Sequence, residues 1–522
     1  IVVYPREGTS HPKKKRKVVR RFASIVFFIF FLIFEIHGQE YQYSELWGES
    51  GEKWSPTSRL PDFSFAGYAR SEKAIPAVPV KLNVKDFGAV GDGEHDDSRA
   101  FIDALDELED GALYIPEGRY RITQIIIIRK PGIVIRGAGP DKSILYFPSP
   151  LNQIKPNWGE TTSGQRTSNY SWSGGFFWLQ GSYQSEKLTE IIQPAKRGDF
   201  SLIVESAANL QIGQEIDIFQ QDNPDNSLAA HIYSGEPGST GNLNGRINIS
   251  LVTKILSMDE NKITFDRPLR FDVELQWQPV IRQFAPTVTN SGIENLGFEF
   301  PITPYEGHFS ELGYNAIAFT GVAFCWVKNI RIRNSDSGFF LSSKFCTIKN
   351  VVYESERNPD FWNNSTGHHG ITLTGDDNLF SDFTFHCKFI HDITVTGCAG
   401  NVIMNGSGID LCFDHHKKGP YDNLFTNIHA GKGGRLWKSG GGRGLGRHCA
   451  ASGTFWNIRA EKSQKHPGGF GPWSMNLVAL TTDKESRIEW AGRWFEAIEP
   501  AMLSPQNIYE AQLSRRLRSL SE

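Results

Sequence analysis

Short apolar runs separated by turn residues dominate the hydrophobic pattern of this chain. Ile125–Ile128 and Ile133–Ile135 are strand-like runs on either side of the turn residues Pro131 and Gly132. Farther along, an Asn or Asp followed by an apolar-x-apolar triplet recurs at five positions, which are Asn329, Asn350, Asp382, Asn427 and Asn457. Their spacings of 21, 32, 45 and 30 residues fit a coil of about 21–24 residues if the longest spacing covers two coils and others carry insertions. This repeat predicts a parallel β-helix, in which each coil buries its faces on its neighbours, and fits β-propeller blades of about 40–50 residues less well.

Two departures from the repeat set the expected domain organisation. Apolar residues at helical spacing between Ala100 and Leu108 predict a helix that caps the open end of the solenoid. Short strands with polar turns predict a small inserted β domain at 195–275. The other expected segments are an upstream basic segment and signal peptide (1–38), an extended lead-in (39–81), N-terminal β-helix coils (82–194), the main β-helix with candidate site loops (276–465), and a C-terminal capping segment with an amphipathic helix (466–522).

The N-terminal coils carry a family resemblance. The stretch LNVKDFGAVGDGEHDDSRAFIDAL (Leu82–Leu105), GALYIPEGRYRI (Gly111–Ile122) and GIVIRGAGPDKSILYF (Gly132–Phe147) together resemble the start of the pectate lyase superfamily. The resemblance implies an all-β fold, a right-handed parallel β-helix, and an action on carbohydrate. It transfers no catalytic residue by motif, and this superfamily holds lyases, hydrolases and phage tail proteins.

The N-terminus predicts export. Arg20 and Arg21 precede the apolar run Ile25–Phe34, which has the length of a signal-peptide core and is short for a membrane span. We expect a secreted, periplasmic or extracellular protein without a stable membrane span after cleavage; a retained N-terminal anchor is the alternative. The six cysteines form no CxxC pair, and we expect buried thiols rather than disulfides.

Charge is distributed unevenly along the chain. The net charge is −3, but residues 1–38 hold eight Lys/Arg and two Asp/Glu, which leaves 47 basic and 56 acidic residues, or −9, in the remainder. An acidic body is a poor general nucleic-acid binder, so no nucleic-acid partner is expected. By contrast, residues 415–448 hold seven Lys/Arg, one acid (Asp422) and four histidines. A basic, His-rich segment on an acidic protein predicts an anionic polysaccharide as the partner; a solvated charged loop is the alternative.

Excess length between repeat positions indicates where a site lies. The insertions fall near Pro359–Gly370, Phe413–Tyr421 and Lys432–Arg447. Since insertions at one corner of a solenoid project from one face, these loops should line one cleft.

A polysaccharide lyase needs a cation to neutralise the uronate carboxylate and a base to remove the adjacent C5 proton. Histidine suits the base role near neutral pH. The candidate catalytic residues are His369, His415, His416, Lys417 and His448. The candidate substrate-binding residues are His368, Arg435, Trp437, Lys438, Arg443 and Arg447, with core packing an equal alternative for Trp437. Because strand side chains alternate, only one residue of His368/His369 and one of His415/His416 should face the cleft, and His386 and His391 are expected to be structural.

Two other functions stay open. A glycoside hydrolase acting on an anionic or sulfated polysaccharide would use a carboxyl pair, for which the candidates are Asp376, Asp377, Asp410 and Asp414. The same carboxylates are candidates for Ca²⁺, although no ligand spacing identifies a metal site. The third possibility is a non-catalytic glycan-binding solenoid. No P-loop, HExxH or dinucleotide-binding motif is present, so no organic cofactor is expected.

Overall fold

The computed structural model describes residues 41–161 and 163–521. The expected upstream segment and signal peptide (1–38) lie outside the described residues. Every helix of the described residues is too short or too polar to cross a lipid bilayer.

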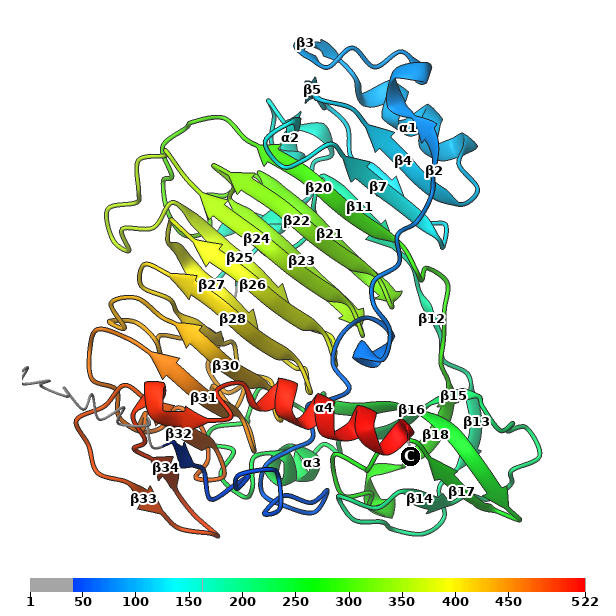
Figure 1. The fold of residues 1–522 in the computed structure, drawn as a ribbon, viewed down its shortest axis with the longest axis vertical. Helices are drawn as coiled ribbons and strands as arrows, with labels where there is room; N and C mark the ends of the chain where they lie inside the picture. The colour runs from blue at the N-terminus through cyan, green and yellow to red at the C-terminus, as the bar shows by residue number, and fades with distance from the viewer. Residues whose placement is uncertain (1–40, 162, 522) are drawn as a thin grey trace, which may run out of the picture. The chain divides into compact units, whose positions relative to one another are not determined.

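Two long parallel sheets run side by side through most of the described chain (Figure 1). From β20 to β30 successive strands alternate between the sheets, and each pairs in parallel with the strand two places along the chain. Within the described residues, sheet 1 has sixteen strands: β2 (Val80–Asn83), β3 (Asp92–Asp96), β4 (Gly111–Ile115), β5 (Gly118–Arg121), β7 (Ile133–Gly137), β8 (Ser143–Tyr146), β20 (Gly292–Glu299), β22 (Trp326–Arg333), β24 (Thr347–Glu354), β26 (Leu379–Phe385), β28 (Val402–Gly408), β30 (Leu424–His429), β31 (Thr454–Arg459), β32 (Asn476–Leu480), β33 (Arg487–Ile488) and β34 (Trp494–Glu496). Sheet 2, likewise counted, has seven: β6 (Ile126–Ile128), β11 (Phe177–Gln180), β21 (Asn315–Ala323), β23 (Ser337–Lys344), β25 (Gly367–Leu373), β27 (Phe389–Val395) and β29 (Phe413–His415). The predicted parallel β-helix is confirmed.

The Asn/Asp repeat marks one bend in each coil of sheet 1. All five predicted positions have a positive φ, between 52° and 57°, a left-handed conformation that Asn and Asp tolerate better than most residues. Asn405 adopts the same conformation between Asp382 and Asn427, so the spacing of 45 residues does cover two coils. The side chains also form a ladder, in which Asn427 Nδ2 donates to Asn405 Oδ1 over 2.8 Å.

The space between the sheets is filled by one apolar core of inward-facing Ile, Leu, Val and Phe side chains. Helix α1 (Ser98–Glu107) extends this core at the N-terminal end, since Phe101 packs edge-on against Phe177 of sheet 2 at 6.3 Å. The six cysteines are free and buried, as expected. Buried thiols act here as small apolar side chains.

A six-stranded antiparallel sheet interrupts the solenoid between β11 and β20. Its strands are β13 (Lys187–Glu190), β14 (Ser201–Ile203), β15 (Glu215–Gln221), β16 (Asn248–Asp259), β17 (Lys262–Phe265) and β18 (Val280–Gln283), and α3 (Ser227–Ile232) lies in the same insertion. This sheet has its own apolar core. The strands run from Lys187 to Gln283, beyond both ends of the expected range 195–275.

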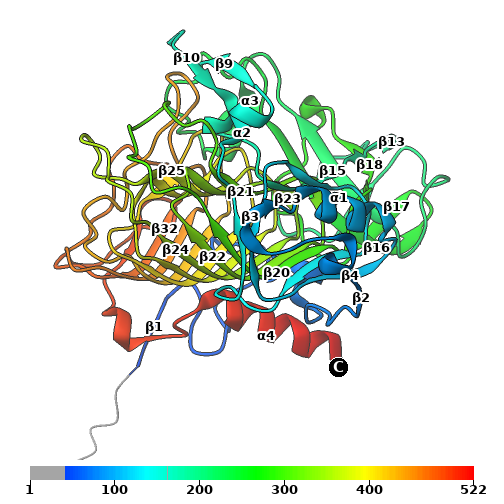
Figure 2. The same cartoon turned by 90° about the horizontal axis from the view of Figure 1, so that it is seen from above.

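The lead-in and the C-terminal helix cover the outer face of sheet 1 (Figure 2). Helix α4 (Ile508–Ser521) buries Ile508 and Tyr509 in a cluster with outward-facing residues of sheet 1, such as Trp456. Trp47 and Phe63 of the lead-in join the same cluster. These segments therefore cover one face of sheet 1 and leave the outer face of sheet 2 for other roles.

Candidate active site

Three loops join sheet 1 to sheet 2 or replace a sheet 2 strand at the same corner of the solenoid. They are residues 300–314 after β20, 355–366 after β24 and 430–453 after β30. Two of the three coincide with predicted insertions. The third predicted insertion, Phe413–Tyr421, is mostly strand β29 and its return to sheet 1, which leaves from the opposite end of the strand. The loop 300–314 takes its place at the corner.

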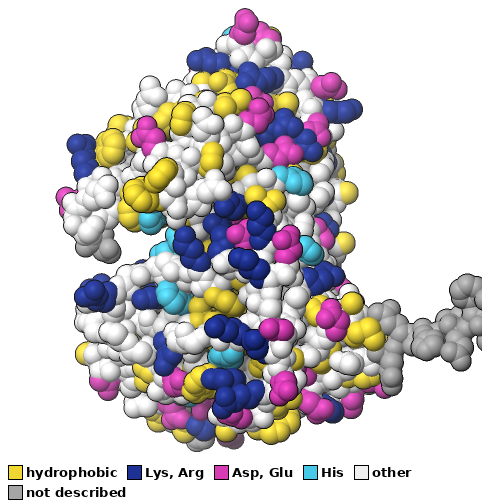
Figure 3. Space-filling view, turned by 90° about the vertical axis from the view of Figure 1, so that its left-hand side faces the viewer, with side chains coloured by type: hydrophobic (Ala, Val, Ile, Leu, Met, Phe, Trp, Pro, Cys, Tyr) yellow, Lys and Arg dark blue, Asp and Glu magenta, His cyan; other side chains and the backbone are white. Residues whose placement is uncertain are grey.

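The outer face of sheet 2 beneath these loops carries a cluster of histidines. His368 and His369 come from β25, His391 from β27, His416 follows β29, and His308 comes from the loop 300–314. Neighbouring ring centroids are 4.0 to 5.9 Å apart. Figure 3 shows this side of the molecule, where histidines border a recess and Lys and Arg side chains gather beside it. We call these five histidines, with Asp414, the histidine cluster.

Asp414 and His416 form a hydrogen-bonded pair within the cluster. His416 Nδ1 lies 2.8 Å from Asp414 Oδ2, which also accepts from Thr394 Oγ1 at 3.1 Å, while Asp414 Oδ1 accepts from the backbone N–H of Gly440 at 2.7 Å. The Asp414 side chain is fully buried, whereas that of His416 is 34% exposed. This arrangement fixes the imidazole ring and leaves Nε2 as the nitrogen free to exchange a proton, which is the geometry of a general base.

Gly440 is the residue that lets the loop 430–453 approach this pair. A Cβ atom at position 440 would lie 2.5 Å from His416 Cε1 and 3.0 Å from His391 Cε1. Carbon atoms in contact are normally about 3.5–4.0 Å apart. A side chain at this position would therefore displace the candidate base.

Two more cluster histidines are held by side chains from two strands and a loop. His369 Nδ1 lies 3.2 Å from Thr372 Oγ1 and 3.3 Å from Thr394 Oγ1. His368 Nδ1 lies 3.3 Å from Glu311 Oε1, and the same carboxyl group accepts a hydrogen bond from Tyr305.

Burial controls protonation in the cluster. It lowers the pKa of His368 and His369 well below the ordinary value for histidine, and lowers that of His391 to about 4. Burial alone would raise the pKa of Asp414, but His391 and the hydrogen bond from His416 outweigh it, and the pKa lies well below the usual range. Asp414 is therefore ionised at neutral pH, while the buried histidines beside it are neutral.

Two predicted catalytic residues lie outside the cluster. His415 points into the core, where its ring centroid is 5.1 Å from Phe470 and 5.3 Å from Phe425. His448 lies behind it, with Nδ1 3.1 Å from the carbonyl oxygen of His415. We therefore correct the assignment of His415, because strand alternation sends His416 to the cleft and His415 inward.

Several predicted cationic residues have structural partners. Arg435 is largely buried, forms an ion pair with Asp392 and donates to the carbonyl oxygen of Asp410 over 2.9 Å. Arg447 donates to the carbonyl oxygen of Glu236, in the insertion after α3, over 2.8 Å. Both arginines connect parts of the fold, so we correct their assignment as substrate-binding residues.

The remaining candidates of the basic loops differ in their contacts. Lys417 donates to the carbonyl oxygen of Gly442 over 3.1 Å and Lys438 donates to Asn363 Oδ1 over 3.0 Å. Arg443 is exposed. Trp437 packs edge-on against Phe455 at 4.7 Å, which is the core-packing alternative, although part of it lines a groove beside Lys438.

The four candidate aspartates have different partners. Asp377 is buried in ion pairs with Arg267, at 2.9 Å, and Arg270, and Asp376 pairs with Lys344. Asp410 accepts from the Gly434 N–H at 2.8 Å.

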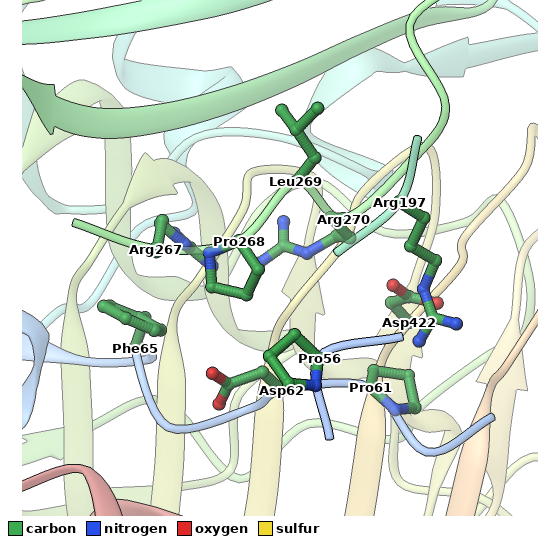
Figure 4. Close-up of a pocket in the computed structure, with 10 residues that line it drawn as sticks. All are labelled: Pro56, Pro61, Asp62, Phe65, Arg197, Arg267, Pro268, Leu269, Arg270 and Asp422. Atoms are coloured by element: carbon green, nitrogen blue, oxygen red, sulfur yellow. The ribbon is translucent and has the colours of Figure 1, made fainter. Parts of the chain in front are cut away.

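Arg267 and Arg270 belong to the inserted sheet region and border a small cavity together with residues of the lead-in (Figure 4). The Asp377 ion pairs thus join the solenoid to the insertion. Asp414 is the one candidate aspartate that the described residues place in the histidine cluster.

Sequence reasoning missed two members of the cluster. The sequence predicts a structural role for His391 and gives no role to His308. The register gives a signal for the first, since His369 and His391 are paired in adjacent coils. His308 lies in an irregular loop, where no periodicity indicates which way a side chain points.

Two groups of described residues have donor atoms close enough to hold a metal ion. One is His308, His368 and His391, the other is His391, Asp414 and His416, and in each the donor atoms lie within 4.8 Å of one another. Imidazole-rich sets suit Zn²⁺ and similar ions, whereas Ca²⁺ takes oxygen ligands. The donor chemistry of the cluster thus differs from that expected for Ca²⁺.

Comparisons with known proteins match the N-terminal coils. Residues 81–155 match the family model for "Rhamnogalacturonase A/epimerase, pectate lyase-like". Mannuronan C5-epimerase AlgE3 of Azotobacter vinelandii is 31% identical over 121 residues, which are 22% of this chain and 6% of that protein. Alginate lyase 7 of the same organism is 31% identical over 100 residues, or 17% and 12% of the two chains. The chain thus spans only a small part of these relatives.

Among solved structures, the tailspike protein gp49 of Pseudomonas phage LKA1 is similar with a TM-score of 0.47 and 14% sequence identity, over 76% of this chain and 67% of that one. The family match falls on the residues that carried the resemblance in the sequence, and the strands around them form stacked parallel coils. The chain is a parallel β-helix protein whose N-terminal coils are similar to the pectate-lyase-like family.

Proposed function

We propose that this chain is an exported enzyme that cleaves an anionic, uronic-acid-containing polysaccharide by β-elimination, with His416 as the base. The observation that carries the proposal is the pair of a buried Asp414 and a part-exposed His416, which lies against the loop 430–453. Matches to polysaccharide-acting relatives, a C5-epimerase and an alginate lyase, support the substrate class.

The chemistry assigned to the pair is a single proton abstraction. His416 Nε2 takes the C5 proton, the C5–H electron pair forms a double bond between C4 and C5, and the C4–O bond breaks. The departing oxygen takes a proton from solvent. Asp414 stabilises the imidazolium that forms, as a carboxylate does in other Asp–His pairs.

A basic groove beside the cluster supports binding of a polyanion. It has a volume of about 730 Å³ and lies between the loop 430–453 and residues 462–484. Its charged lining residues are Arg435, Lys438, Lys462, Lys465, Asp483 and Lys484. Since Arg435 is neutralised by Asp392 and Lys484 by Asp483, Lys438, Lys462 and Lys465 are the cations of this lining that remain for carboxylates or sulfates of a glycan.

The proposal is tested by incubating the chain with a panel of polygalacturonate, alginate, glucuronan, chondroitin, carrageenan and fucan. New reducing ends and the ultraviolet absorbance of an unsaturated uronate are recorded together. β-Elimination predicts that both signals rise in step on at least one uronate polymer. Reducing ends without the absorbance would refute elimination and favour hydrolysis.

A glycan that binds without either signal would favour a non-catalytic solenoid. A changed uronate composition without cleavage would instead indicate C5 epimerisation, which needs the same proton abstraction.

A further inference from the structure

We propose that His308, His368 and His391 bind a divalent transition-metal ion of the Zn²⁺ class, and that this ion takes the carboxylate of the uronic acid next to His416. The second half rests on the function proposed above; the first half does not. The three imidazoles come from three separate elements, the loop 300–314, β25 and β27, and their donor atoms lie within 4.8 Å of one another.

Two of the three rings are buried and have a ring nitrogen without a hydrogen bond. His368 and His391 are 2% and 5% exposed. The Nδ1 atom of each has no hydrogen-bond partner among the described residues. A buried polar atom without a partner costs about 1–3 kcal/mol, so such atoms in a fold usually indicate a ligand or a catalytic role.

A carboxylate lies beside each of these Nδ1 atoms. Glu311 Oε1 is 3.3 Å from His368 Nδ1, and Asp414 Oδ2 is 3.1 Å from His391 Nδ1. Metal-binding histidines commonly place one ring nitrogen against a carboxylate and use the other for the ion. Glu311 and Asp414 are therefore placed to orient the two rings, each of which offers one ring nitrogen to the ion.

The charges around the cluster also call for a cation. Asp414 is buried, and its ion pairs within the described chain are made to histidines rather than to Lys or Arg. Buried carboxylates require a compensating positive charge. A divalent ion held by neutral imidazoles supplies it.

The alternative donor set, His391 with Asp414 and His416, is less suited to the ion. His416 and Asp414 already satisfy each other over 2.8 Å, and both are needed for the proton transfer. His308 is exposed, so an ion on the first set is reachable from the recess. Zinc bound by three histidines keeps an open position for a further oxygen ligand.

This placement also supplies the cation that elimination requires. Arg435 and Arg447 are occupied by Asp392 and Glu236, so neither is free to neutralise a uronate. An ion next to the His391–His416 ring contact, where the centroids are 5.4 Å apart, would be adjacent to the base. A metal-bound carboxylate acidifies the C5 proton that His416 removes.

The test uses the full chain without a polyhistidine tag. The chain is stripped with chelator and dialysed. Zn²⁺ binding is then measured by isothermal titration calorimetry, and Co²⁺ is added as a spectroscopic probe. One equivalent of ion and a visible ligand-field band from Co²⁺ are expected. His308→Ala should weaken Zn²⁺ binding more than about tenfold. The control variant His386→Ala, which removes an exposed histidine outside the cluster, should bind Zn²⁺ with wild-type affinity. Thermal melting verifies that both variants are folded.

Absence of stoichiometric binding of either ion, or unchanged binding in His308→Ala, would overturn the metal site. If Zn²⁺ binds but the stripped and loaded chains cleave the glycan equally fast, the role in neutralising the carboxylate is wrong. The proposed function fails separately: His416→Gln should retain the ion and lose turnover, and full turnover in that variant would refute the base while leaving the metal site intact.

Discussion

His415 provides a sharp test of which histidine of the His415–His416 pair faces the cleft. It is fully buried among Phe425, Phe455 and Phe470, and burial lowers its pKa to about 4. The unfolded chain should titrate near the ordinary value of about 6.5. As pH falls below that value, the unfolded state binds a proton that the native state refuses, so stability is lost between about pH 6.5 and pH 4.

The size of this loss follows from the two pKa values. At pH 5 the contribution of His415 is roughly 2 kcal/mol, and it approaches about 3 kcal/mol near pH 4, since each pKa unit corresponds to about 1.4 kcal/mol. A phenyl ring has a similar shape and cannot be protonated. His415→Phe should therefore remove this part of the acid sensitivity while other titrating groups continue to act equally in both proteins.

Urea unfolding followed by tryptophan fluorescence at pH 7.5 and pH 5 measures the effect. The stability of His415→Phe relative to wild type should rise by roughly 2 kcal/mol between the two pH values, and turnover at pH 7.5 should be retained. An unchanged pH dependence would refute the buried, neutral state. Loss of turnover in a folded His415→Phe protein would refute its assignment to the core.

Three further predictions address positioning, binding and stability. Gly440→Ala should reduce turnover by about 10²-fold, because the new Cβ displaces the base. The control Gly468→Ala, whose Cβ would meet open space, should match the wild-type rate. Equal rates for the two variants would contradict the close approach of Gly440 to His416. Trp362 is 86% exposed in the loop that Lys438 contacts. Trp362→Ala should therefore raise KM roughly threefold to tenfold by loss of sugar stacking, whereas the control Trp490→Ala should leave KM unchanged. Equal KM values for Trp362→Ala and the wild-type chain would exclude a stacking role. Asp377→Asn leaves two buried arginines uncompensated and should lower the free energy of unfolding in urea by about 3–5 kcal/mol. Turnover measured at low temperature, where the variant is still folded, should persist. A stable but inactive variant would favour the hydrolase alternative.

The repeat was predictable because it has a local physical cause. The Asn/Asp positions adopt a left-handed bend in each coil, and the same residue type is favoured wherever the bend recurs. The repeat therefore predicts the coil length, the parallel stacking and the general position of two long loops.

Individual site residues were harder to predict because strand alternation is broken next to the cluster. A Cβ at Gly370 would point towards the Phe385 ring in the core, and Ile371 beside it also faces inward. The local irregularity brings His368, His369 and His391 to one cluster, whereas strict alternation would have separated the first two. At His415 and His416 alternation holds, and the expectation that one of them faces the cleft is met by His416.

Sequence patterns do not identify the partners of a charged residue when those partners lie far away in the chain. Asp377 is paired with arginines about 110 residues earlier in the chain, and Glu236, which holds Arg447, lies in the insertion. A charged residue in a loop has the same appearance in the sequence whether it is free for a substrate or bound to such a partner. The corrected assignments of Arg435, Arg447 and Asp377 share this cause.

The most direct test of the central claim compares His416→Gln with the wild-type chain on the glycan that gives the strongest ultraviolet signal. Turnover and glycan binding, the latter by affinity electrophoresis, are measured on the same preparations. If His416 is the base, turnover should fall by about 10²–10⁴-fold while binding stays within about twofold of wild type, because Gln preserves the polar surface of the recess. Turnover close to that of wild type in the folded variant would contradict the assignment of His416 as the base.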